Sequence, residues 1–517
     1  MPELFPPGVA LPLALAAPLL CSAGVGVLGA RPNLRDGWTV VVSIVTFLAV
    51  GSLWRPVAAG EPVELDLWPM LDGVALGFSV EPLGLLFGLV ASGLWILTSI
   101  YAFGYMRGHH EKNQTRFFVC FAAAIAAALG IAFSRNLLTL FLFYEALTFS
   151  TYPLVTHHET EEARRAGRVY LGVLVSTSIG FLLLAVISTW RLTGTLELTA
   201  GGILGDVSDR AAWALLLLFV FGIAKAALMP FHRWLPAAMV APTPVSALLH
   251  AVAVVKAGVF AVLKVALYVF GLERLRELGT GLLEGTGPLL LVASFTVLSA
   301  SVVALFQDNL KRRLAYSTIS QLSYIVIGAM LATSAGALGA GLHVLTHALG
   351  KITLFFCAGA IMVAAHETEI SRMGGLGRRM PFTFLAFLLA SISIIGLPPF
   401  AGAWSKWFLL LGAYQAERDW VVWVLLLSSL LNVAYLLPIP VAAFFGSAAS
   451  AKRPDHDDGD ADDGEDAGDA DDADETAADV HEAPWLCVGP LLATAILCVV
   501  VFVWIDPWIA LLERIAQ

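Results

Sequence analysis

The sequence predicts an all-α polytopic membrane protein with about 14 transmembrane helices. Of its 517 residues, 58% are hydrophobic and 14% are charged, whereas a soluble protein uses roughly 45–50% apolar and about 25% charged residues. Apolar runs of roughly 20 residues, long enough to cross the ~30 Å hydrocarbon core, recur along the chain. They begin near residues 8, 38, 82, 117, 136, 170, 211, 241, 284, 316, 335, 381, 420 and 486. Several runs contain ionisable residues, which at membrane depth usually mark an ion or proton path.

The arginines and lysines between the runs predict the orientation of the chain. Seventeen of the 30 lie on one set of alternate loops, eight lie on the other set, and five lysines lie inside the runs. Because short cytoplasmic loops carry the excess of positive charge, we expect both termini on the outer side of a cytoplasmic membrane. The lipid bilayer is the expected surrounding, and no nucleic acid partner is expected.

The runs divide the chain into five parts. Residues 1–110 hold the first three helices and an alternating stretch, VELDLWPMLDGVALGFSV, which favours an outer β-hairpin. Residues 111–275 and 276–447 hold helices 4–8 and helices 9–13. Residues 448–484 are predicted to be a disordered cytoplasmic loop, because a segment with 15 Asp and Glu cannot bury enough apolar surface to fold. Residues 485–517 hold helix 14 and the C-terminus.

A carboxylate lies at the middle of the fifth run, NLLTLFLFYEALTFSTYPLV. This residue, Glu145, must find a positive partner or stay protonated, and Lys225 in the seventh run is the expected partner. A pair whose separation changes would shift the pKa of the lysine, because a nearby carboxylate favours the ammonium and desolvation favours the neutral amine. A fixed ion pair that only packs helices is the alternative.

The seventh and eighth runs combine buried amines with irregular backbone. Pro230 removes an amide donor close to Lys225, and broken backbone is tolerated at membrane depth where it faces protein or a water-filled cavity. An ordinary proline kink is the alternative. Ser246 and His250 share a helix face. Lys256, six residues beyond His250, does not share that face on a regular helix, so the helix is irregular there, or a neighbouring helix or water completes the link.

Two ionisable residues near the ends of runs are interpreted as peripheral. Lys264 lies two turns after Lys256 near the outer end of its run, and we expect it to extend to the membrane interface. Glu81, at the mouth of the third run, is expected to be an interfacial cap and not a proton carrier.

The eleventh run has the most regular spacing of ionisable residues. His343, His347 and Lys351 stand at i, i+4 and i+8, which places them along about 12 Å of one helix face. Two histidines at i and i+4 can also bind a metal, but no acidic or sulfur ligand stands near them in the sequence, and Lys351 continues the row. The spacing therefore favours a proton relay over a metal site or a passive polar seam.

The twelfth run repeats the pattern of the seventh. In ISIIGLPPFAGAWSKWFLLLGA, glycine and two prolines interrupt the helix before Lys406. Interrupted helices in corresponding positions indicate internal repeats in transporters. Because helices 7 and 12 cross the membrane in opposite directions, we predict two inverted five-helix repeats in which helices 7 and 12 are discontinuous.

The cysteines give no sign of a cofactor. All five, at positions 21, 120, 357, 487 and 498, lie in apolar runs without a CxxC spacing, so we expect small buried hydrophobic residues and no metal or iron–sulfur site. No nucleotide or flavin motif is present, and no cofactor is predicted. The chain is therefore expected not to be an enzyme, with any redox activity in partner subunits.

Five segments together resemble a known family. They are FLFYEALTFSTYPLV, KAALMPFHRWLPAAMVAPTPVSALLHAVAVVKAGV, DNLKRRLAYSTISQLSYI, HVLTHALGKITLFF and GLPPFAGAWSKWF. They resemble the antiporter-like subunits of respiratory complex I and of Mrp-type multisubunit cation/proton antiporters, over roughly residues 80 to 430. Within the family the chain looks most like the D-type subunits of Mrp antiporters.

The resemblance implies roles for the ionisable residues. Carried over by motif, these are the glutamate of the fifth helix, the lysine of the seventh, the pair of the eighth, the trio of the eleventh and the lysine of the twelfth, namely Glu145, Lys225, His250, Lys256, His343, His347, Lys351 and Lys406. Lys406 is similar to the lysine-bearing members and departs from the complex I subunit M type, which carries glutamate there. Tyr144 stands where many members have tryptophan, a change that is expected to be mild.

Three functions follow as hypotheses. The first is a proton-translocating subunit of a multisubunit Na⁺(K⁺)/H⁺ antiporter, with other membrane subunits as partners and protons, and sodium or potassium, as transported ions. The second is a proton-pumping subunit of a complex I-like or hydrogenase-type respiratory complex. The third is a membrane scaffold subunit whose charges only hold partners together.

Overall fold

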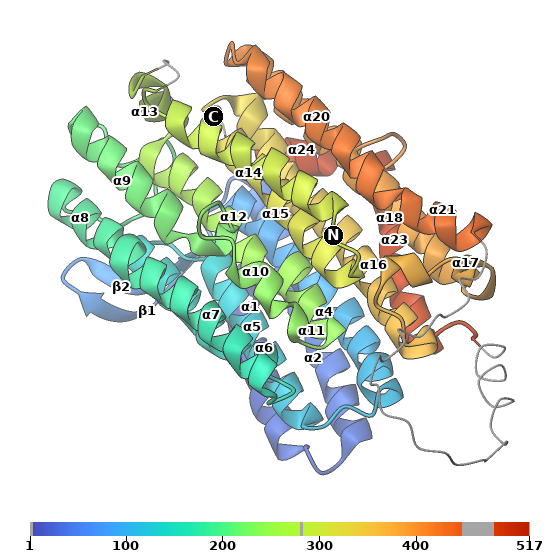
Figure 1. The fold of residues 1–517 in the computed structure, drawn as a ribbon. Helices are drawn as coiled ribbons and strands as arrows, with labels where there is room; N and C mark the ends of the chain where they lie inside the picture. The colour runs from blue at the N-terminus through green and yellow to red at the C-terminus, as the bar shows by residue number, and fades with distance from the viewer. Residues whose placement is uncertain (1–3, 280–282, 447–479, 516–517) are drawn as a thin grey trace, which may run out of the picture.

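The computed structural model describes residues 4–279, 283–446 and 480–515. In these ranges the chain forms a bundle of long helices that run side by side (Figure 1). Eleven helices of the described residues are long and apolar enough to cross a membrane. Three further crossings are the interrupted pairs α9–α10 and α18–α19 and the more polar α15. This arrangement is consistent with the predicted number of about 14. The acidic segment 448–484 lies almost wholly outside the described residues.

The first part of the chain holds three crossings and a β-hairpin, as predicted. Its elements are α1 (Pro7–Val27), α2 (Pro32–Ser52), α3 (Trp54–Ala59), β1 (Glu64–Leu71), β2 (Val74–Ser79) and α4 (Pro82–Gly108). The two strands pair antiparallel from Glu64 opposite Ser79 to Leu71 opposite Val74. The turn between them uses Gly73 at φ +76°, a conformation that glycine adopts readily.

The second part, predicted as helices 4–8, contains the first interrupted crossing. Its elements are α5 (Gln114–Ala132), α6 (Leu137–Val155), α7 (Glu161–Thr177), a π-helical segment (Ser178–Leu183), α8 (Leu184–Thr193), α9 (Asp209–Gly222), 3₁₀ turns (Ala224–Ala226 and Ala238–Val240), α10 (Trp234–Ala237), α11 (Thr243–Ala247), a π-helical segment (Leu248–Val252), α12 (Val254–Val265), a π-helical segment (Ala266–Phe270) and α13 (Leu272–Glu277). The side chains of Asn136 and Thr160 accept hydrogen bonds from the first turns of α6 and α7, which fixes where these helices begin.

The third part repeats the interrupted crossing. Its elements, with those of the C-terminal part, are α14 (Gly287–Leu305), α15 (Leu310–Met330), α16 (Ser334–Ala365), a 3₁₀ turn (Ile370–Arg372), α17 (Leu376–Arg379), α18 (Pro381–Ile395), α19 (Gly402–Gln415), α20 (Asp419–Leu436), α21 (Pro438–Phe445), α23 (Trp485–Val503) and α24 (Asp506–Glu513). The pairs α9–α10 and α18–α19 confirm that helices 7 and 12 are discontinuous. The inverted relation of the two halves remains a prediction.

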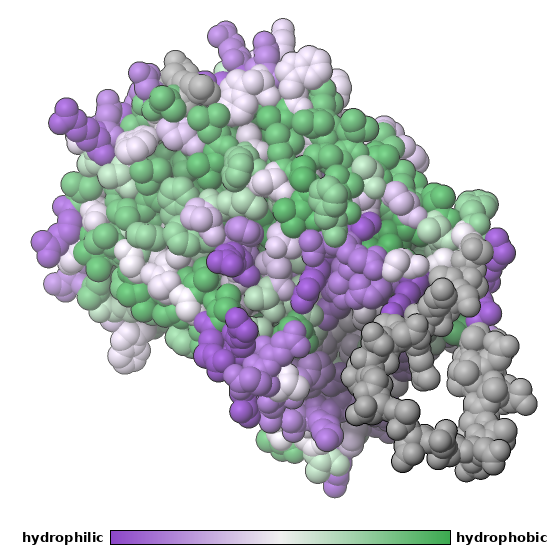
Figure 2. All heavy atoms as spheres, viewed as in Figure 1, coloured by the Kyte–Doolittle hydropathy of each residue, from purple (hydrophilic) through white to green (hydrophobic). Residues whose placement is uncertain are grey.

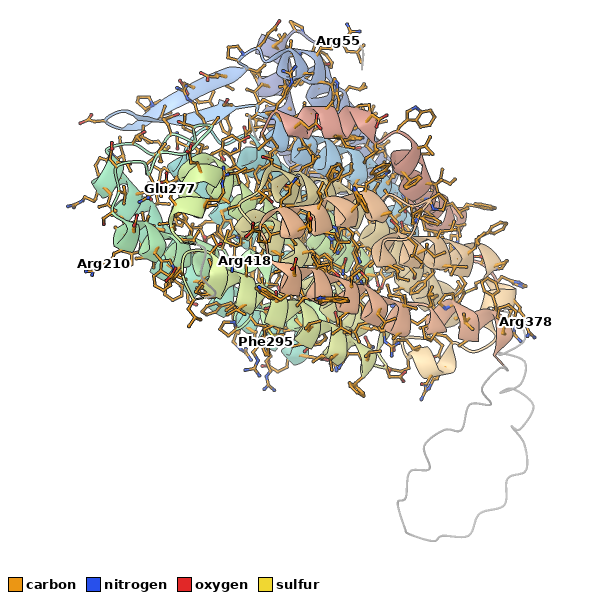
Figure 3. The ribbon with its side chains drawn as sticks, turned by 90° about the horizontal axis from the view of Figure 1, so that it is seen from above. Arg55, Arg210, Glu277, Phe295, Arg378 and Arg418 are labelled. Carbon is orange, nitrogen blue, oxygen red and sulfur yellow. The ribbon has the colours of Figure 1, made fainter. Side chains whose placement is uncertain are left out.

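The loops gather at two opposite faces of the bundle. The terminal face carries α3, the β-hairpin and α24, and the rings of Trp54 and Trp508 meet there with centroids 5.3 Å apart. The basic face carries the loops after α4, α6, α14 and α16. Figure 1 places the hairpin and α17 at opposite ends of the bundle, and Figure 3 places Arg210 and Arg378 there too. On the face shown in Figure 2, apolar side chains form a broad area between the ends, as expected where a chain faces lipid.

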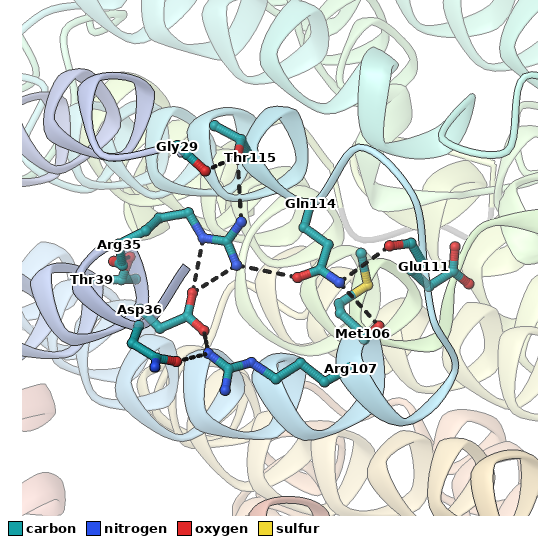
Figure 4. A network of polar contacts seen from close by, with 10 residues as sticks. Gly29, Arg35, Asp36, Thr39, Met106, Arg107, Glu111, Gln114 and Thr115 are labelled. Atoms are coloured by element: carbon teal, nitrogen blue, oxygen red, sulfur yellow. Dashed lines mark hydrogen bonds and ion pairs between the residues drawn. The ribbon is translucent and has the colours of Figure 1, made fainter. Parts of the chain in front are cut away.

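A buried ion network fixes the helix ends on the basic face (Figure 4). Arg35 donates from Nε to Oδ1 of Asp36 at 2.9 Å, and a guanidinium nitrogen reaches Oε1 of Gln114 at 3.2 Å. Arg107 pairs with the other oxygen of Asp36. Gln114 in turn donates to the carbonyl oxygen of Glu111 at 3.2 Å. The network therefore ties α2, α4 and α5 together and holds the loop that carries Glu111.

Candidate functional site

The backbone around Lys225 is unwound, as the sequence predicts. Helix α9 ends at Gly222, Lys225 lies in a 3₁₀ turn, and Ala227 adopts a left-handed conformation with φ +54°. The break begins at Ile223, seven residues before Pro230, so it is a true interruption and the alternative of an ordinary proline kink is wrong. The chain re-forms a helix only at α10.

Helix α12 packs directly against this unwound segment. A Cβ atom at Gly258 would lie 2.3 Å from the carbonyl carbon of Lys225, so only glycine allows the two backbones to come this close. The indole of Trp234 donates to the carbonyl oxygen of Ala224 at 3.0 Å, which satisfies one of the acceptors that the break exposes. The first amine of the site is thus held against the helix that carries the second, Lys256.

Helix α6 supplies the partners of the Lys225 amine. Nζ donates to the carbonyl oxygen of Tyr144 at 2.8 Å and to Oγ1 of Thr148 at 2.6 Å, and it lies 3.2 Å from the centroid of the Tyr144 ring. The hydroxyl of Tyr144 accepts a hydrogen bond from the backbone N–H of Lys225 at 3.1 Å. A tryptophan side chain has no acceptor for that bond, so the tyrosine has a role of its own in this chain.

Glu145 does not touch the amine in this structure. The two residues interact electrostatically, but among the described residues no ion pair joins them. Glu145 is half-buried, its Oε1 atom is enclosed without a hydrogen-bond partner, and its neighbours Leu142 and Phe149 on α6 are exposed. The carboxylate therefore stands at the lateral edge of the chain, one residue away from the groups that bind the amine. A pair whose separation changes remains a prediction.

The helix that carries His250 is irregular, which was one of the two predicted alternatives. His250 lies in the π-helical segment Leu248–Val252, before α12 begins at Val254. Its ring packs on Phe355 with centroids 4.6 Å apart, and neither ring nitrogen has a hydrogen-bond partner among the described residues. Lys256 does not reach His250. Its Nζ lies 2.6 Å from Nδ1 of His347, so a neighbouring helix supplies its partner.

The predicted row on α16 is present and fully buried. The rings of His343 and His347 stack with centroids 5.6 Å apart and an interplanar angle of 17°. His343 approaches Oγ of Ser405 with Nδ1 at 2.9 Å, which joins the row to the residue before Lys406. Lys351 turns to α15, where Nζ donates to Oγ of Ser317 at 2.6 Å. The three side chains share a face, as predicted, but they reach different helices.

Lys406 is the last of the predicted site residues and lies at the second interrupted helix. Helix α18 ends at Ile395, Gly396 takes φ +90°, and α19 begins at Gly402. The Nζ atom of Lys406 donates to the carbonyl oxygen of Ile395 at 2.9 Å and to Oγ of Ser429 at 3.0 Å. An apolar surface pocket of about 340 Å³ also reaches Lys406. The last amine is thus almost fully buried, yet it borders the outside of the chain.

A cavity lies on the basic face, at the start of α11. It has a volume of about 170 Å³, and Glu111, His158 and Thr243 lie in its wall. Thr243 begins α11. Ser246 follows Thr243 by three residues, and His250 follows Ser246 by four, which are helical spacings. The hydroxyl of Ser246 is buried and has no hydrogen-bond partner within the part of the chain that the structure describes. Polar groups therefore continue from the cavity toward the centre of the bundle.

The expected interfacial position of Lys264 and the expected cap by Glu81 were wrong, while the expectation that Glu81 is not a proton carrier stays a prediction. Lys264 is fully buried and does not extend to the interface; its Nζ lies 2.6 Å from Oε1 of Glu81. Glu81 precedes α4 but makes no side-chain cap to it. Both residues lie at the ends of apolar runs, and no local sequence pattern predicts that their side chains meet. Even so, the spacing of eight residues from Lys256 to Lys264 marks a second amine on one helix.

The arrangement suits proton transfer. Amines, imidazoles and hydroxyls lie in hydrogen-bonding contact, and each can give or accept a proton. No group of three or more histidine, cysteine or acidic side chains in the described ranges could hold a metal ion. The proton positions between Lys256 and His347 depend on the histidine tautomer, so one proton can belong to either partner.

Comparisons with known proteins show which family the chain is similar to. Residues 134–432 match the family model described as NADH:quinone oxidoreductase/Mrp antiporter, TM. NADH-quinone oxidoreductase subunit N of Desulforudis audaxviator is 32% identical over 80% of this chain and 80% of its own length. NAD(P)H-quinone oxidoreductase subunit 5 of the organellar chromatophore of Paulinella chromatophora is 35% identical over 64% of this chain and 50% of its own.

The fold also matches a solved structure of an Mrp complex from Dietzia sp. DQ12-45-1b. The TM-score is 0.83 at 22% identity, over 98% of this chain and 96% of that chain. The chain spans about half the length of several of the curated relatives that it matches. More than half of its residues fall within the family model, and the chain belongs to the NADH:quinone oxidoreductase/Mrp antiporter family of membrane subunits.

Proposed function

We propose that this chain is the proton-translocating subunit of a multisubunit Na⁺(K⁺)/H⁺ antiporter. One observation carries the proposal: amines and imidazoles stand in series across the bundle interior, from Lys225 through Lys256 and His347 to His343 and Lys406, and almost all are fully buried. Burying a charge is expensive, and a scaffold would gain the same packing from apolar side chains. A series of buried groups that can each take up and release a proton is what stepwise transfer needs.

Water would complete the series where the protein atoms do not meet. The free nitrogens of His250, Nε2 of His343 and Nε2 of His347 have no hydrogen-bond partner among the described residues, and buried polar atoms are ordinarily paired. Protons would enter from the basic-face cavity or near Glu145, load Lys225, and move by His250, Lys256 and the α16 row to Lys406. Each transfer changes the electrostatic energy of the next site, because such interactions are strong at low dielectric.

Partner subunits would cover the two lateral edges of the series. Glu145 stands beside exposed apolar side chains of α6, and Lys406 borders an apolar surface pocket. An uncovered carboxylate facing hydrocarbon would have to stay protonated, so a neighbouring subunit is the natural lining for these edges. By the positive-inside rule, the basic face would be cytoplasmic, with both termini outside.

Transport by the reconstituted complex tests the proposal. We expect Glu145→Gln and Lys225→Ala to abolish cation-driven proton movement in vesicles while the complex still assembles, because each removes a group that must bind or steer the proton. Lys406→Ala should do the same. Lys112→Ala, in an exposed basic-face loop, is the control and should leave transport intact. Near-normal transport in the first two variants would refute the role, and transport that survives Lys406→Ala would favour a scaffold.

A redox-driven proton pump is the second candidate. It is favoured by the sequence relatives, which are named as quinone oxidoreductase subunits and reach 35% identity. The purified complex separates the two functions. Iron–sulfur or flavin absorbance, with proton movement that needs an electron donor and not sodium or potassium, would support the pump. Proton movement driven by a sodium or potassium gradient in a complex without redox centres would support the antiporter.

A further inference from the structure

The terminal face carries an ion pair that the proton path described above does not use. Nζ of Lys264 lies 2.6 Å from Oε1 of Glu81 and donates to the carbonyl oxygen of Ser134 at 2.7 Å. The lysine side chain is 1% exposed and the glutamate side chain 16%. The amine is therefore sealed inside the bundle, while its carboxylate partner reaches the protein surface.

The exposed side of Glu81 borders a water-accessible cleft. The cleft has a volume of about 650 Å³ on the terminal face, and Glu61, Glu513 and Arg514 also line it. One carboxylate thus touches both the cleft and the buried amine. An ion pair that only clamped two helices would need neither an opening to water nor charged groups around that opening.

A buried hydroxyl without a partner lies near the same ion pair. Tyr268 is more than nine-tenths buried, its hydroxyl has no hydrogen-bond partner within the described residues, and it interacts electrostatically with Glu81. Because buried hydroxyls are ordinarily paired, water or a mobile proton would find an unused hydrogen-bonding group beside the ion pair.

Helix α12 connects this pair to the amine series. Lys264 follows Lys256 by eight residues, or about 12 Å of helix rise, and both side chains are fully buried. Between them, the ring of Phe260 packs on Phe87 with centroids 4.8 Å apart. The two amines thus lie on one helix, with the aromatic side chain of Phe260 between them in the sequence.

We propose that Glu81 and Lys264 form a proton-binding site that exchanges protons between the α12 amines and the aqueous phase at the terminal face. Protonation of Glu81 from the cleft would release Lys264 from the ion pair, and loss of that proton would restore it. The Phe87–Phe260 contact would prevent continuous proton exchange between the two amines. This inference rests on the proposed proton-translocating function.

The test uses the intact complex in vesicles with uniform orientation. The pH is varied separately on the terminal-face and basic-face sides, and an enclosed pH-sensitive dye reports the initial rate of proton movement driven by a sodium or potassium gradient. Glu81→Gln and Lys264→Met should lower this rate about tenfold or more, with unchanged amounts of complex. Glu81→Asp should keep part of the rate and move its dependence on terminal-face pH, while the dependence on basic-face pH stays as in the wild type.

A neighbouring ion-pair cluster provides the matched control. Arg135 binds Asp66 and Glu197 on the same face at 2.9 Å each, so Arg135→Gln disturbs local structure without touching the amine series and should leave the rate and both pH profiles intact. Wild-type rates in Glu81→Gln and Lys264→Met, or an unmoved pH profile in Glu81→Asp, would overturn the inference. If Lys225→Ala also kept full transport, the proposed function itself would fail.

Discussion

The Nζ atom of Lys256 lies 2.6 Å from Nδ1 of His347, although 91 residues separate them in the chain. This contact joins α12 of the first half to α16 of the second. In the proposed function, a proton held by one predicted repeat would pass at this contact to a base of the other. Transfer between the halves would then depend on one amine and one imidazole.

Replacing His347 should interrupt transfer between the halves. His347→Ala leaves the Lys256 amine without its only hydrogen-bond partner in the described residues, and we expect transport to fall about tenfold or more. Thr353→Val is the control, because Thr353 lies on the same helix and donates to Thr494, away from the row. The initial rate of proton movement per assembled complex measures both. Equal rates in the two variants would contradict the relay.

Replacing Tyr144 should destabilise the unwound segment. Tyr144→Phe removes the hydroxyl that accepts from the backbone N–H of Lys225, and an unsatisfied buried amide costs about 1–3 kcal/mol. The ring and the carbonyl oxygen that contact Nζ stay in place. Thermal unfolding of the purified subunit measures the loss. Tyr152→Phe on the same helix is the control, because the Tyr152 hydroxyl makes no hydrogen bond within the described residues; an unchanged Tm in Tyr144→Phe would count against the capping role.

Replacing Asp36 should weaken the helix ends on the basic face. Asp36→Asn leaves the buried Arg35 without its carboxylate partner, and loss of one member of a buried pair costs about 3–5 kcal/mol. Arg107, whose side chain is 43% exposed, also pairs with Asp36, and Arg107→Gln should cost about 1 kcal/mol or less. Denaturant unfolding in detergent compares the two. A larger effect of Arg107→Gln would show that the outer arm of the network stabilises it.

His157 should make the protein less stable in mild acid. Burial lowers the pKa of His157 to about 4, and His158 and Arg116 lower it as well, while an unfolded histidine titrates near pH 6.5. Between these values the unfolded chain binds a proton that the folded chain does not, so stability falls as the pH drops from about 6.5 toward 4. In His157→Gln this loss should disappear. The Tm of the variant should therefore rise relative to that of the wild type between pH 7 and pH 5.

The neighbouring Glu111 should change the stability with pH in the opposite direction. Burial raises the pKa of Glu111, and the positive charges of His158 and Lys311 only partly counter this. A folded state that holds the proton more tightly than the unfolded state gains stability as the pH falls through the raised pKa. Glu111→Gln should therefore be most stabilising at neutral pH and approach the wild type in acid. If the Tm of the wild type and of Glu111→Gln changed with pH in parallel, the raised pKa of Glu111 would be contradicted.

The sequence predicted groups along one helix better than contacts between helices. The spacing of His343, His347 and Lys351 gave their common face on α16, because helical periodicity alone determines azimuth. Which helix each residue would contact depends on packing that no local pattern encodes, so the Lys256–His347 contact and the turn of Lys351 to Ser317 emerged only from the fold. Glycine and proline gave both interrupted crossings, since they disfavour helix directly.

The peripheral residues were the hardest to predict. The hydropathy of the run around Lys264 decreases toward the terminal face, which is also what an interfacial lysine would produce. Strand β2 pairs with Ser134, whose carbonyl oxygen binds the amine, and Glu81 reaches the amine from the start of α4. Such long-range contacts have no signature in a single run. The role of the Tyr144 hydroxyl was missed for a similar reason, because the backbone amide that it binds lies in the unwound segment around Lys225, 81 residues away in the chain.

The enclosure of the segment Thr243–Phe270 has a consequence for biogenesis. Every residue of this stretch is buried within the described chain, and α16, which lies against α11 and α12, is synthesised some hundred residues later. During translation Lys256 must therefore wait for its partner His347 until α16 has been made. Chains that stall or are truncated before α16 would leave this amine without its partner, and membrane quality control could recognise them by that exposed charge.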